Sequence, residues 1–491
     1  MGTTERRAHH QVTFAVLAVG VVAFALLQSL VIPVLPTIQQ ALRTDQADVT
    51  WVLTAYLLSA SISTPILGRL GDMIGKQRMF VVALVALAVG CLIAALASSL
   101  AVMIVARVVQ GIGGGVLPLA FGIVRDEFPR DRAPGAIGAI SSLMAVGGGV
   151  GLVLAGPIVD LLDHHWLFWL PLIVLVLAAV AAQLLIPESP VRSAGSVNWL
   201  AALLLSGWLV ALLLAVSQAP GWGWGSPAVL GLLAVAVVTV VLWVVVESRA
   251  RQPLIDMRMM RSRAVWTVNV VAFLFGVAMY SAFAFFPQFL QTPSSAGYGF
   301  GASVTESGLM MLPQTVTAFV LGLVAGRMAQ RVGSRNVLVI GSVLSAAGYL
   351  AFALVHEARW EIYLISALMG TGFGLAFAAM SNLIVAAVPP EQTGVASGMN
   401  ANIRTIGGAI GAAAMASVVT AHAGPAGLPT ESGYTNGFLL LTLSLLLSAG
   451  SALLIPVVRR DPVTHLEPDV GLRHPEAALV AGGTVVGDGP E

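Results

Sequence analysis

Charged residues divide this sequence into long uncharged intervals, and this spacing constrains the fold more than any other feature. Only 10% of the 491 residues are Asp, Glu, Lys or Arg, whereas roughly 25% is usual in soluble globular proteins. A helix that crosses a bilayer needs about 20 apolar residues, so the 57% of hydrophobic residues allows at most about 14 crossings. A soluble enzyme and a soluble domain with a single anchor are both excluded.

The uncharged intervals predict fourteen spanning helices. The interval between Arg192 and Glu247 counts as two, because Pro220 and three glycines divide it beside Trp222 and Trp224, which is typical of a turn at the membrane interface. The expected spans are 12–34, 50–68, 79–97, 101–124, 136–159, 166–186, 197–218, 226–246, 264–286, 307–326, 336–355, 362–387, 396–420 and 436–458.

The basic residues predict the orientation of these helices. An even number of spans places both termini on one side, and the loops on that side contain 20 of the 24 Lys and Arg residues. Cytoplasmic loops are the ones that carry such an excess. We therefore expect a multi-pass protein of the plasma membrane whose termini are both cytoplasmic.

The sequence also contains an internal repeat at a shift of 258 to 260 residues. Repeats of this kind are typical of transporters built from two related halves with a substrate site between them. The repeat predicts an all-α membrane protein with six-helix bundles at 1–195 and 264–458, two inserted helices at 196–263 and a disordered tail at 459–491. Matching positions include Gly68 and Gly326, Gly111 and Gly370, Gly113 and Gly372, Gly115 and Gly374, Gly147 and Gly407, and Gly151 and Gly411.

Other chemistry is not indicated. Cys91 is the only cysteine, and the sequence contains no HExxH, GxSxG or Walker A motif. We therefore expect no metal site, no cofactor and no enzymatic activity. The 24 basic and 23 acidic residues nearly cancel, so nucleic acid is not an expected partner.

The segment GRLGDMIGKQR, from Gly68 to Arg78, resembles the signature loop of the major facilitator superfamily. Together with fourteen helices and an inserted pair, it resembles the drug/proton antiporter branch of that superfamily. The resemblance implies a latch between the two halves, and a loop that only marks topology through its basic residues is the alternative. The residues of the expected latch are Gly68, Arg69, Asp72, Gly75 and Arg78.

The run that begins with Arg107 and Gln110 resembles the fourth-helix motif of the same superfamily, whose arginine is associated with proton transfer. An arginine inside a spanning helix costs about 2.5–3.5 kcal/mol on insertion scales, so it normally faces a polar cavity or a partner. The alternative is an arginine that extends to the membrane surface.

Gly151, Gly156 and Pro157 resemble the fifth-helix motif of the antiporters. Small residues allow helices to pack closely, and this packing role is also the alternative to a role in exchange. The sequence continues as Ile158-Val159-Asp160, where the family often has a glycine pair.

The first helix lacks the acidic residue that the fourteen-helix branch often carries there. Gln28 lies in this stretch, and no Asp or Glu falls in the middle of any expected span. Asp72, Asp160 and Glu306 remain as residues that could change protonation during transport. We place Glu306 with Arg107, Gln110 and Gln28 among the coupling candidates; a solvated carboxylate at a helix start is the alternative for Glu306.

Polar and aromatic residues at helical spacing predict the lining of a central cavity. Flexible methionines and aromatic rings favour varied apolar substrates, although packing between helices or against lipid is the alternative for each residue. The predicted cavity residues are Tyr56, Ser59, Asn269, Phe273, Tyr280, Gln314, Phe377 and Arg404.

The sequence therefore predicts a secondary transporter in the lipid bilayer, functional as a monomer, that exports hydrophobic or amphipathic small molecules in exchange for protons. A facilitator or importer of one metabolite remains an alternative because the first-helix acid is missing. A membrane sensor or scaffold without transport is the alternative from another class.

Overall fold

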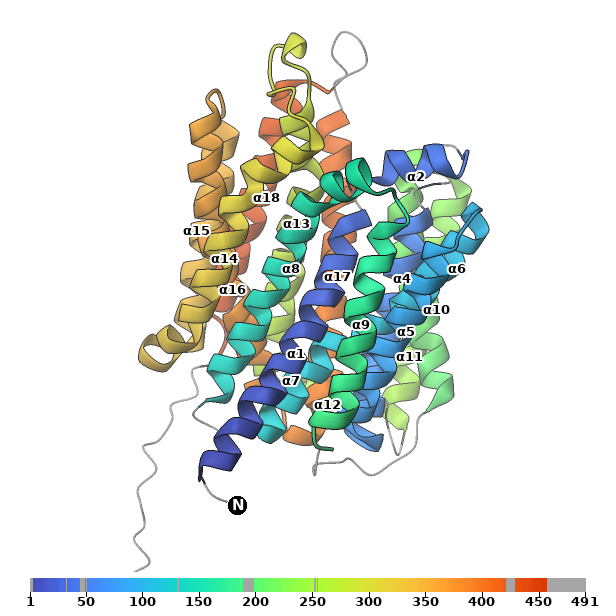
Figure 1. Cartoon of the computed structure of the whole chain (residues 1–491), viewed down its shortest axis with the longest axis vertical. Helices are drawn as coiled ribbons and strands as arrows, with labels where there is room; N and C mark the ends of the chain where they lie inside the picture. The colour runs from blue at the N-terminus through green and yellow to red at the C-terminus, as the bar shows by residue number, and fades with distance from the viewer. Residues whose placement is uncertain are drawn as a thin grey trace, which may run out of the picture. The chain divides into compact units, whose positions relative to one another are not determined.

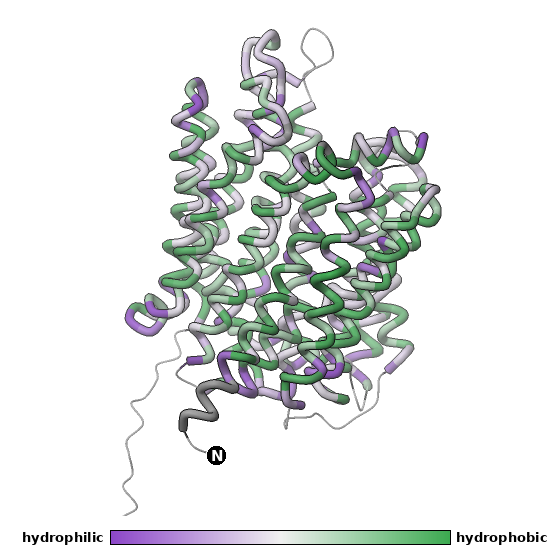
Figure 2. Tube along the Cα trace, in the orientation of Figure 1, coloured by the Kyte–Doolittle hydropathy of each residue, from purple (hydrophilic) through white to green (hydrophobic). Residues whose placement is uncertain are grey.

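Fourteen helices in the described part of the chain are long and apolar enough to cross a membrane, as the sequence predicts (Figure 1). The structure is a computed structural model that describes residues 3–31, 33–44, 49, 51–129, 132–188, 198–250, 253, 255–420 and 429–456. The predicted tail at 459–491 lies outside these residues. Hydrophobic residues occupy the middle of the helices and hydrophilic residues gather at their ends (Figure 2).

Each spanning segment is one α-helix except the fourth and the thirteenth, which each include a short 3-10 turn, and no strand occurs among the described residues. The spanning helices are α1 (Thr3–Val31), α4 (Trp51–Ile74), α5 (Lys76–Ala95), α6 (Leu100–Gly111) with α7 (Val116–Glu127), α8 (Ala133–Leu161), α9 (Trp166–Leu185), α10 (Trp199–Trp222), α11 (Pro227–Arg249), α13 (Arg263–Gln291), α14 (Val304–Val332), α15 (Ser334–Leu354), α16 (Arg359–Ala386), α17 (Thr393–Thr420) and α18 (Glu431–Ala452). Short helices are α2 (Leu35–Ala41), α12 (Met257–Arg261), η1 (Ile112–Gly115), η2 (Ser294–Ala296) and η3 (Pro390–Gln392).

The fourth span contains a short 3-10 turn, η1, where the sequence predicts one continuous α-helix. Three glycines form this turn, and a side chain on them would collide with neighbouring helices. A Cβ added at Gly113 would lie 2.2 Å from Leu87, and one added at Gly115 would lie 2.8 Å from Leu67. The turn therefore allows α4 and α5 to approach the fourth span closely.

Equivalent glycines of the two halves contact equivalent helices, which confirms the repeat. Gly113 faces α5, the third helix of its half, and Gly372 faces α15, the third helix of the other half. The flanking glycines face the second helix of their own half, at Ser59 and Leu67 in α4 and at Gln314 and Ala318 in α14. The same close approaches therefore recur in both halves.

The two halves meet along α8 with α14 and α4 with α17. The inserted helix α10 packs on α4 and α17, where Thr54 and Ser217 place their hydroxyl oxygens 3.3 Å apart. Helix α11 packs mainly on α10, and most of its apolar side chains are exposed. In a bilayer these side chains face lipid.

Close packing at glycines gives a first testable prediction. Gly276 of α13 lies so near α17 that an added Cβ would be 2.0 Å from the Arg404 carbonyl oxygen. We expect Gly276→Val to destabilise the protein by about 1–3 kcal/mol or more, because backbone on both sides must move. The midpoint of thermal denaturation in detergent measures this effect.

Gly207→Val in α10 is the matched control, because no atom lies within 4 Å of an added Cβ at Gly207. Equal midpoints for the two variants would contradict the close approach of α13 and α17.

Candidate functional site

Arg107 is buried in α6 with only 1% of its surface exposed. Its Nε donates to the Val52 carbonyl oxygen at 2.9 Å, and one Nη donates to the Gln110 Oε1 at 2.7 Å. Its guanidinium carbon lies 4.5 Å from the centroid of the Tyr56 ring. The side chain thus points into the bundle and does not extend to the membrane surface.

Two further side chains complete this Arg107 cluster, which we define as Gln28, Tyr56, Cys91, Arg107 and Gln110. Gln28 of α1 donates to the Tyr56 hydroxyl at 2.7 Å, and Gln110 Nε2 lies 3.6 Å from the Cys91 Sγ. Helices α1, α4, α5 and α6 therefore each contribute to one polar network. Within the described residues, no carboxylate forms an ion pair with Arg107.

A second buried arginine lies in the other half. Arg404 of α17 is 6% exposed, and its guanidinium carbon lies 4.7 Å from the centroid of the Phe377 ring of α16. The Tyr280 side chain of α13 is its hydrogen-bonding neighbour. We name Tyr280, Phe377 and Arg404 the Arg404 cluster.

The two clusters lie close to each other at the junction of the halves. Tyr56 and Tyr280 are near enough to interact electrostatically, and Asn402 of α17 donates to the Ser61 carbonyl oxygen of α4. The structure therefore brings together seven of the residues predicted for coupling or for the cavity: Gln28, Tyr56, Arg107, Gln110, Tyr280, Phe377 and Arg404.

Other predicted residues have different neighbours. Ser59 donates to the Val108 carbonyl oxygen at 2.6 Å and so contacts α6. Asn269 accepts a 2.9 Å hydrogen bond from Asn400 near the start of α13. Phe273 packs against the apolar core, with its carbonyl oxygen beside Gly407. Helix rotation, which spacing in the sequence does not reveal, sets these neighbours.

Glu306 does not face the interior. Its side chain is exposed and accepts from the backbone N–H of Ser303, while the Ser303 hydroxyl accepts from the backbone N–H of Glu306. This reciprocal pair is a capping box at the start of α14. Gln314, two turns further, is buried, and its Oε1 has no partner among the described residues.

Asp72 joins the two halves on the amino-terminal face, which we define as the face where α1 begins. Its fully buried carboxylate accepts from the backbone N–H groups of Gly394 and Val395 at 3.2 and 3.1 Å. An added Cβ on Gly68 would lie 2.5 Å from the Gly394 carbonyl oxygen. A carboxylate at the start of α17 is also favoured by the helix dipole.

Two other residues of the predicted latch, Arg78 and Gly75, have contacts within the first half. Arg78 pairs with Glu188 at 2.9 Å, and Gly75 forms the α4–α5 turn with a φ of 133°, which favours glycine. Arg69 is buried. Gly68 and Asp72 are the predicted latch residues whose contacts with the second half are shown above.

The sequence did not predict two contacts that charged residues make on this face. Lys76, fully buried, lies 2.6 Å from Asp126 and 3.8 Å from Asp72. Arg125 of α7 donates to the carbonyl oxygens of Val385 and Val388 at 2.6 and 2.8 Å. The only sequence signal was the position of these charges at helix ends, which the orientation rule already explains.

The fifth-helix residues serve packing. An added Cβ on Gly151 would lie 2.0 Å from Ser29 Oγ of α1, and one on Gly156 would lie 2.6 Å from Thr305 Oγ1 of α14. Pro157 lies within α8. The side chain of Asp160 lies outside what the structure describes.

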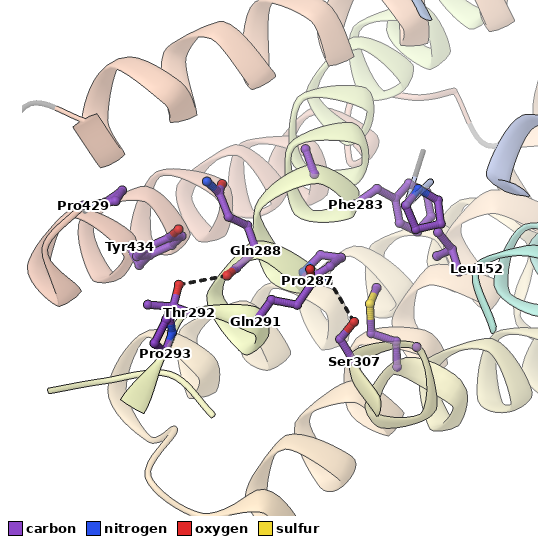
Figure 3. A pocket seen from close by; sticks show the side chains of 14 residues that line it. Leu152, Phe283, Pro287, Gln288, Gln291, Thr292, Pro293, Ser307, Pro429 and Tyr434 are labelled. Carbon is purple, nitrogen blue, oxygen red and sulfur yellow. Dashed lines mark hydrogen bonds between the residues drawn. The ribbon is translucent and has the colours of Figure 1, made fainter. Parts of the chain in front are cut away.

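A cavity of about 400 Å³ lies between the halves near the face opposite the amino-terminal face (Figure 3). Gln291 donates to the Ser307 hydroxyl at 3.1 Å beside it, and Thr292 donates to the Gln288 carbonyl oxygen at 2.9 Å. None of its lining residues is charged. The lining includes Pro33 and Leu152 from the first half and Phe283, Gln288, Gln291, Ser307 and Tyr434 from the second.

The loop between α8 and α9 holds the group of described residues best arranged to bind a metal ion. Asp163, His164 and His165 place three potential ligand atoms within 4.8 Å of one another. Partial burial, followed by the neighbouring His165, lowers the pKa of His164 below its ordinary value. No metal ligands were expected from the sequence.

Comparison with known proteins identifies the family. The model of the Major Facilitator Superfamily matches residues 17–412 and 292–486. The tetracenomycin C resistance and export protein of Streptomyces glaucescens is 31% identical over 417 residues, which cover 84% of this chain and 76% of that protein. The multidrug transporter protein MdtP of Bacillus subtilis is 28% identical, over 76% of this chain and 69% of that protein.

A solved structure shows the same fold. The human organic anion transporter MFSD10 (TETRAN) matches with a TM-score of 0.66 at 16% identity, over 90% of this chain and 99% of that one. At this identity the likeness concerns the fold alone. With its family model, its relatives and fourteen apolar helices, the chain belongs to the major facilitator superfamily and is a multi-pass membrane transporter, not an enzyme.

Proposed function

We propose that this protein exports amphipathic small molecules from the cell in exchange for protons by alternating access. The single observation that carries the proposal is the contrast between the two faces of the junction. Asp72 and Arg125 join the halves on the amino-terminal face, while the cavity lies between the halves near the other face. The relatives named for drug resistance and export support the direction of transport.

The orientation completes the proposal. The excess of basic residues on the amino-terminal face supports a cytoplasmic location for that face. The arrangement then corresponds to a carrier that is closed to the cytoplasm and hollow toward the outside. A substrate that has passed the junction would leave through the cavity bounded by Gln291, Ser307 and Tyr434.

Asp72 is best placed to couple protons to this cycle. Its carboxylate oxygens accept hydrogen bonds from the backbone N–H groups of Gly394 and Val395 in α17. Adding a proton to the carboxylate removes the charge that holds α17 and therefore weakens the closed face. Opening toward the cytoplasm then lets the proton leave and substrate enter. The Arg107 cluster supplies the central polar site, and Glu306 has no part in the proposal.

An efflux assay tests the proposal. Cells that express the protein are loaded with the uncharged dye Nile red in the presence of a protonophore and are then re-energised. We expect dye efflux at least tenfold faster than in cells without the protein, and we expect nigericin, which collapses the pH gradient, to slow it. Efflux equal to that of control cells would refute export, whereas efflux indifferent to the pH gradient would refute proton exchange.

A further inference from the structure

The charges inside the membrane have one sign. Every Asp and Glu in the fourteen described spans lies within two residues of a span's end. Four cations lie further inside. Arg69 and Arg327 are five residues from the end of their spans, and the two deepest are Arg107, seven residues after Leu100, and Arg404, 14 residues after Pro390 and 16 before Thr420. Among the described residues, the interior of the junction, away from both membrane faces, therefore contains two positive charges and no carboxylate, because Asp72 lies at the amino-terminal face.

The two arginines differ in how their donors are used. Arg107 donates to the oxygens of Val52 and Gln110, and its charge lies against the Tyr56 ring. Arg404 has no such set of oxygens, because its buried Nε has no hydrogen-bond partner among the described residues. A buried guanidinium that is only partly satisfied is costly, which indicates that a further acceptor belongs at this position.

An anionic oxygen pair is the acceptor that fits this guanidinium. The Nε and one Nη form the edge that binds carboxylates with two parallel hydrogen bonds. The Phe377 ring and the Tyr280 side chain lie beside it and offer an apolar wall and a hydroxyl. An acidic group joined to an aromatic or aliphatic body would use all of these features.

The electrostatics also select the charge of the substrate. In the interior of the junction, a cationic molecule would meet Arg107 and Arg404 with no carboxylate of the described residues beside them to offset the repulsion, whereas an anion would neutralise one of them. The cavity near the opposite face has no charged lining residue, so it does not compete for an acidic group.

We propose that Arg404 is the counter-ion for an acidic group on the substrate, so that the preferred substrates are amphipathic organic anions. This inference rests on the proposed export function, whose substrate class it names. It also explains why a buried arginine whose Nε has no hydrogen-bond partner among the described residues lies at the middle of α17.

A matched series of probes tests the charge preference. Dansylglycine is an anion, dansylamide is uncharged and dansylcadaverine is a cation, and all three carry the same ring system. Each is titrated against the purified protein in nanodiscs, with empty nanodiscs subtracted, and binding is followed by dansyl fluorescence. We expect the wild-type protein to bind dansylglycine at least tenfold more tightly than dansylamide and dansylcadaverine more weakly than either.

Substitution of Arg404 then tests the residue. We expect Arg404→Gln to lower the ratio of dansylglycine affinity to dansylamide affinity at least tenfold, and Arg404→Lys to lower it less. Arg359→Gln, at an exposed arginine that begins α16, is the control and should leave the ratio unchanged. A ratio unaffected by Arg404→Gln would overturn the proposal.

The wild-type series decides the question even if the Arg404 variants fold poorly, because no preference for dansylglycine also overturns the proposal. The binding measurement needs no proton gradient, so the export proposal and the Arg404 proposal can be refuted separately. Anion binding without efflux of either Nile red or dansylglycine would refute export alone, and Nile red efflux without anion preference would refute the role of Arg404 alone.

Discussion

Replacing Asp72 with Asn should open the amino-terminal face. The carboxylate accepts two backbone hydrogen bonds from α17, and an amide side chain has one acceptor oxygen and no charge. Losing one charge-assisted hydrogen bond and the favourable interaction with the helix dipole amounts to about 2 kcal/mol. This shifts the equilibrium between closed and open forms by about 30-fold.

Cysteine labelling measures this shift. In a Cys91→Ser background, Ser397→Cys places a reporter at a buried position one turn after Gly394. We expect a membrane-impermeant maleimide to label it at least tenfold faster in everted vesicles when Asp72 is Asn. The same variant should export Nile red poorly, because the closed form no longer persists.

The control for this experiment is another buried carboxylate at the end of a helix. Glu247 of α11 is 2% exposed and accepts from the backbone N–H of Ile255 at 3.3 Å, away from the junction of the halves. We expect Glu247→Gln to leave labelling at the parental rate. Equal labelling of the Asp72→Asn and parental proteins would show that this carboxylate does not hold the face closed.

Arg107→Ala should reduce Nile red efflux at least a hundredfold without loss of membrane insertion. Removing the guanidinium leaves the Gln110 amide oxygen without its donor and frees the Tyr56 ring, so the network from α1 to α6 loses its centre. Each buried polar group left unpaired costs about 1–3 kcal/mol. Removal of the buried charge offsets part of this cost, which is why insertion should persist.

Two further variants define the role of Arg107. Lysine keeps the charge but has no planar set of donors for the Val52 and Gln110 oxygens. We therefore expect the efflux rate of the Arg107→Lys variant to be below a tenth of the wild-type rate. Arg359→Ala, an exposed arginine at a helix start, should export normally. Wild-type efflux by Arg107→Ala, at equal amounts in the membrane, would remove this residue from the transport site.

The sequence predicted the helices and the repeat because both depend on local composition. Charged residues are costly in lipid, so their spacing marks the helix ends. Repeated glycines occur where backbones approach, and the Gly113 and Gly372 contacts show the same packing in both halves. Arg107, a charge inside a helix, stood out for the same reason.

The sequence was less informative about individual contacts. Glu306 shared a helical spacing with inward residues, but the capping box with Ser303 turns its carboxylate back to the helix start. Ser59 and Asn269 were expected in the cavity, and each is bound to a neighbouring helix of its own half. Arg125 gave no signal beyond its position at a helix end, because its acceptors, which include the Val385 and Val388 carbonyl oxygens and the Thr393 hydroxyl, lie about 260 residues away.

By itself, the sequence determined that the chain lies in a membrane, how many times its helices can cross it, and that its halves are related. Only the tertiary structure decided which polar side chains meet, such as Asp72 with the start of α17 and Gln28 with Tyr56. In lipid both faces of a spanning helix are apolar, so the hydrophobic pattern does not reveal which face turns inward. Packing between distant helices sets that rotation.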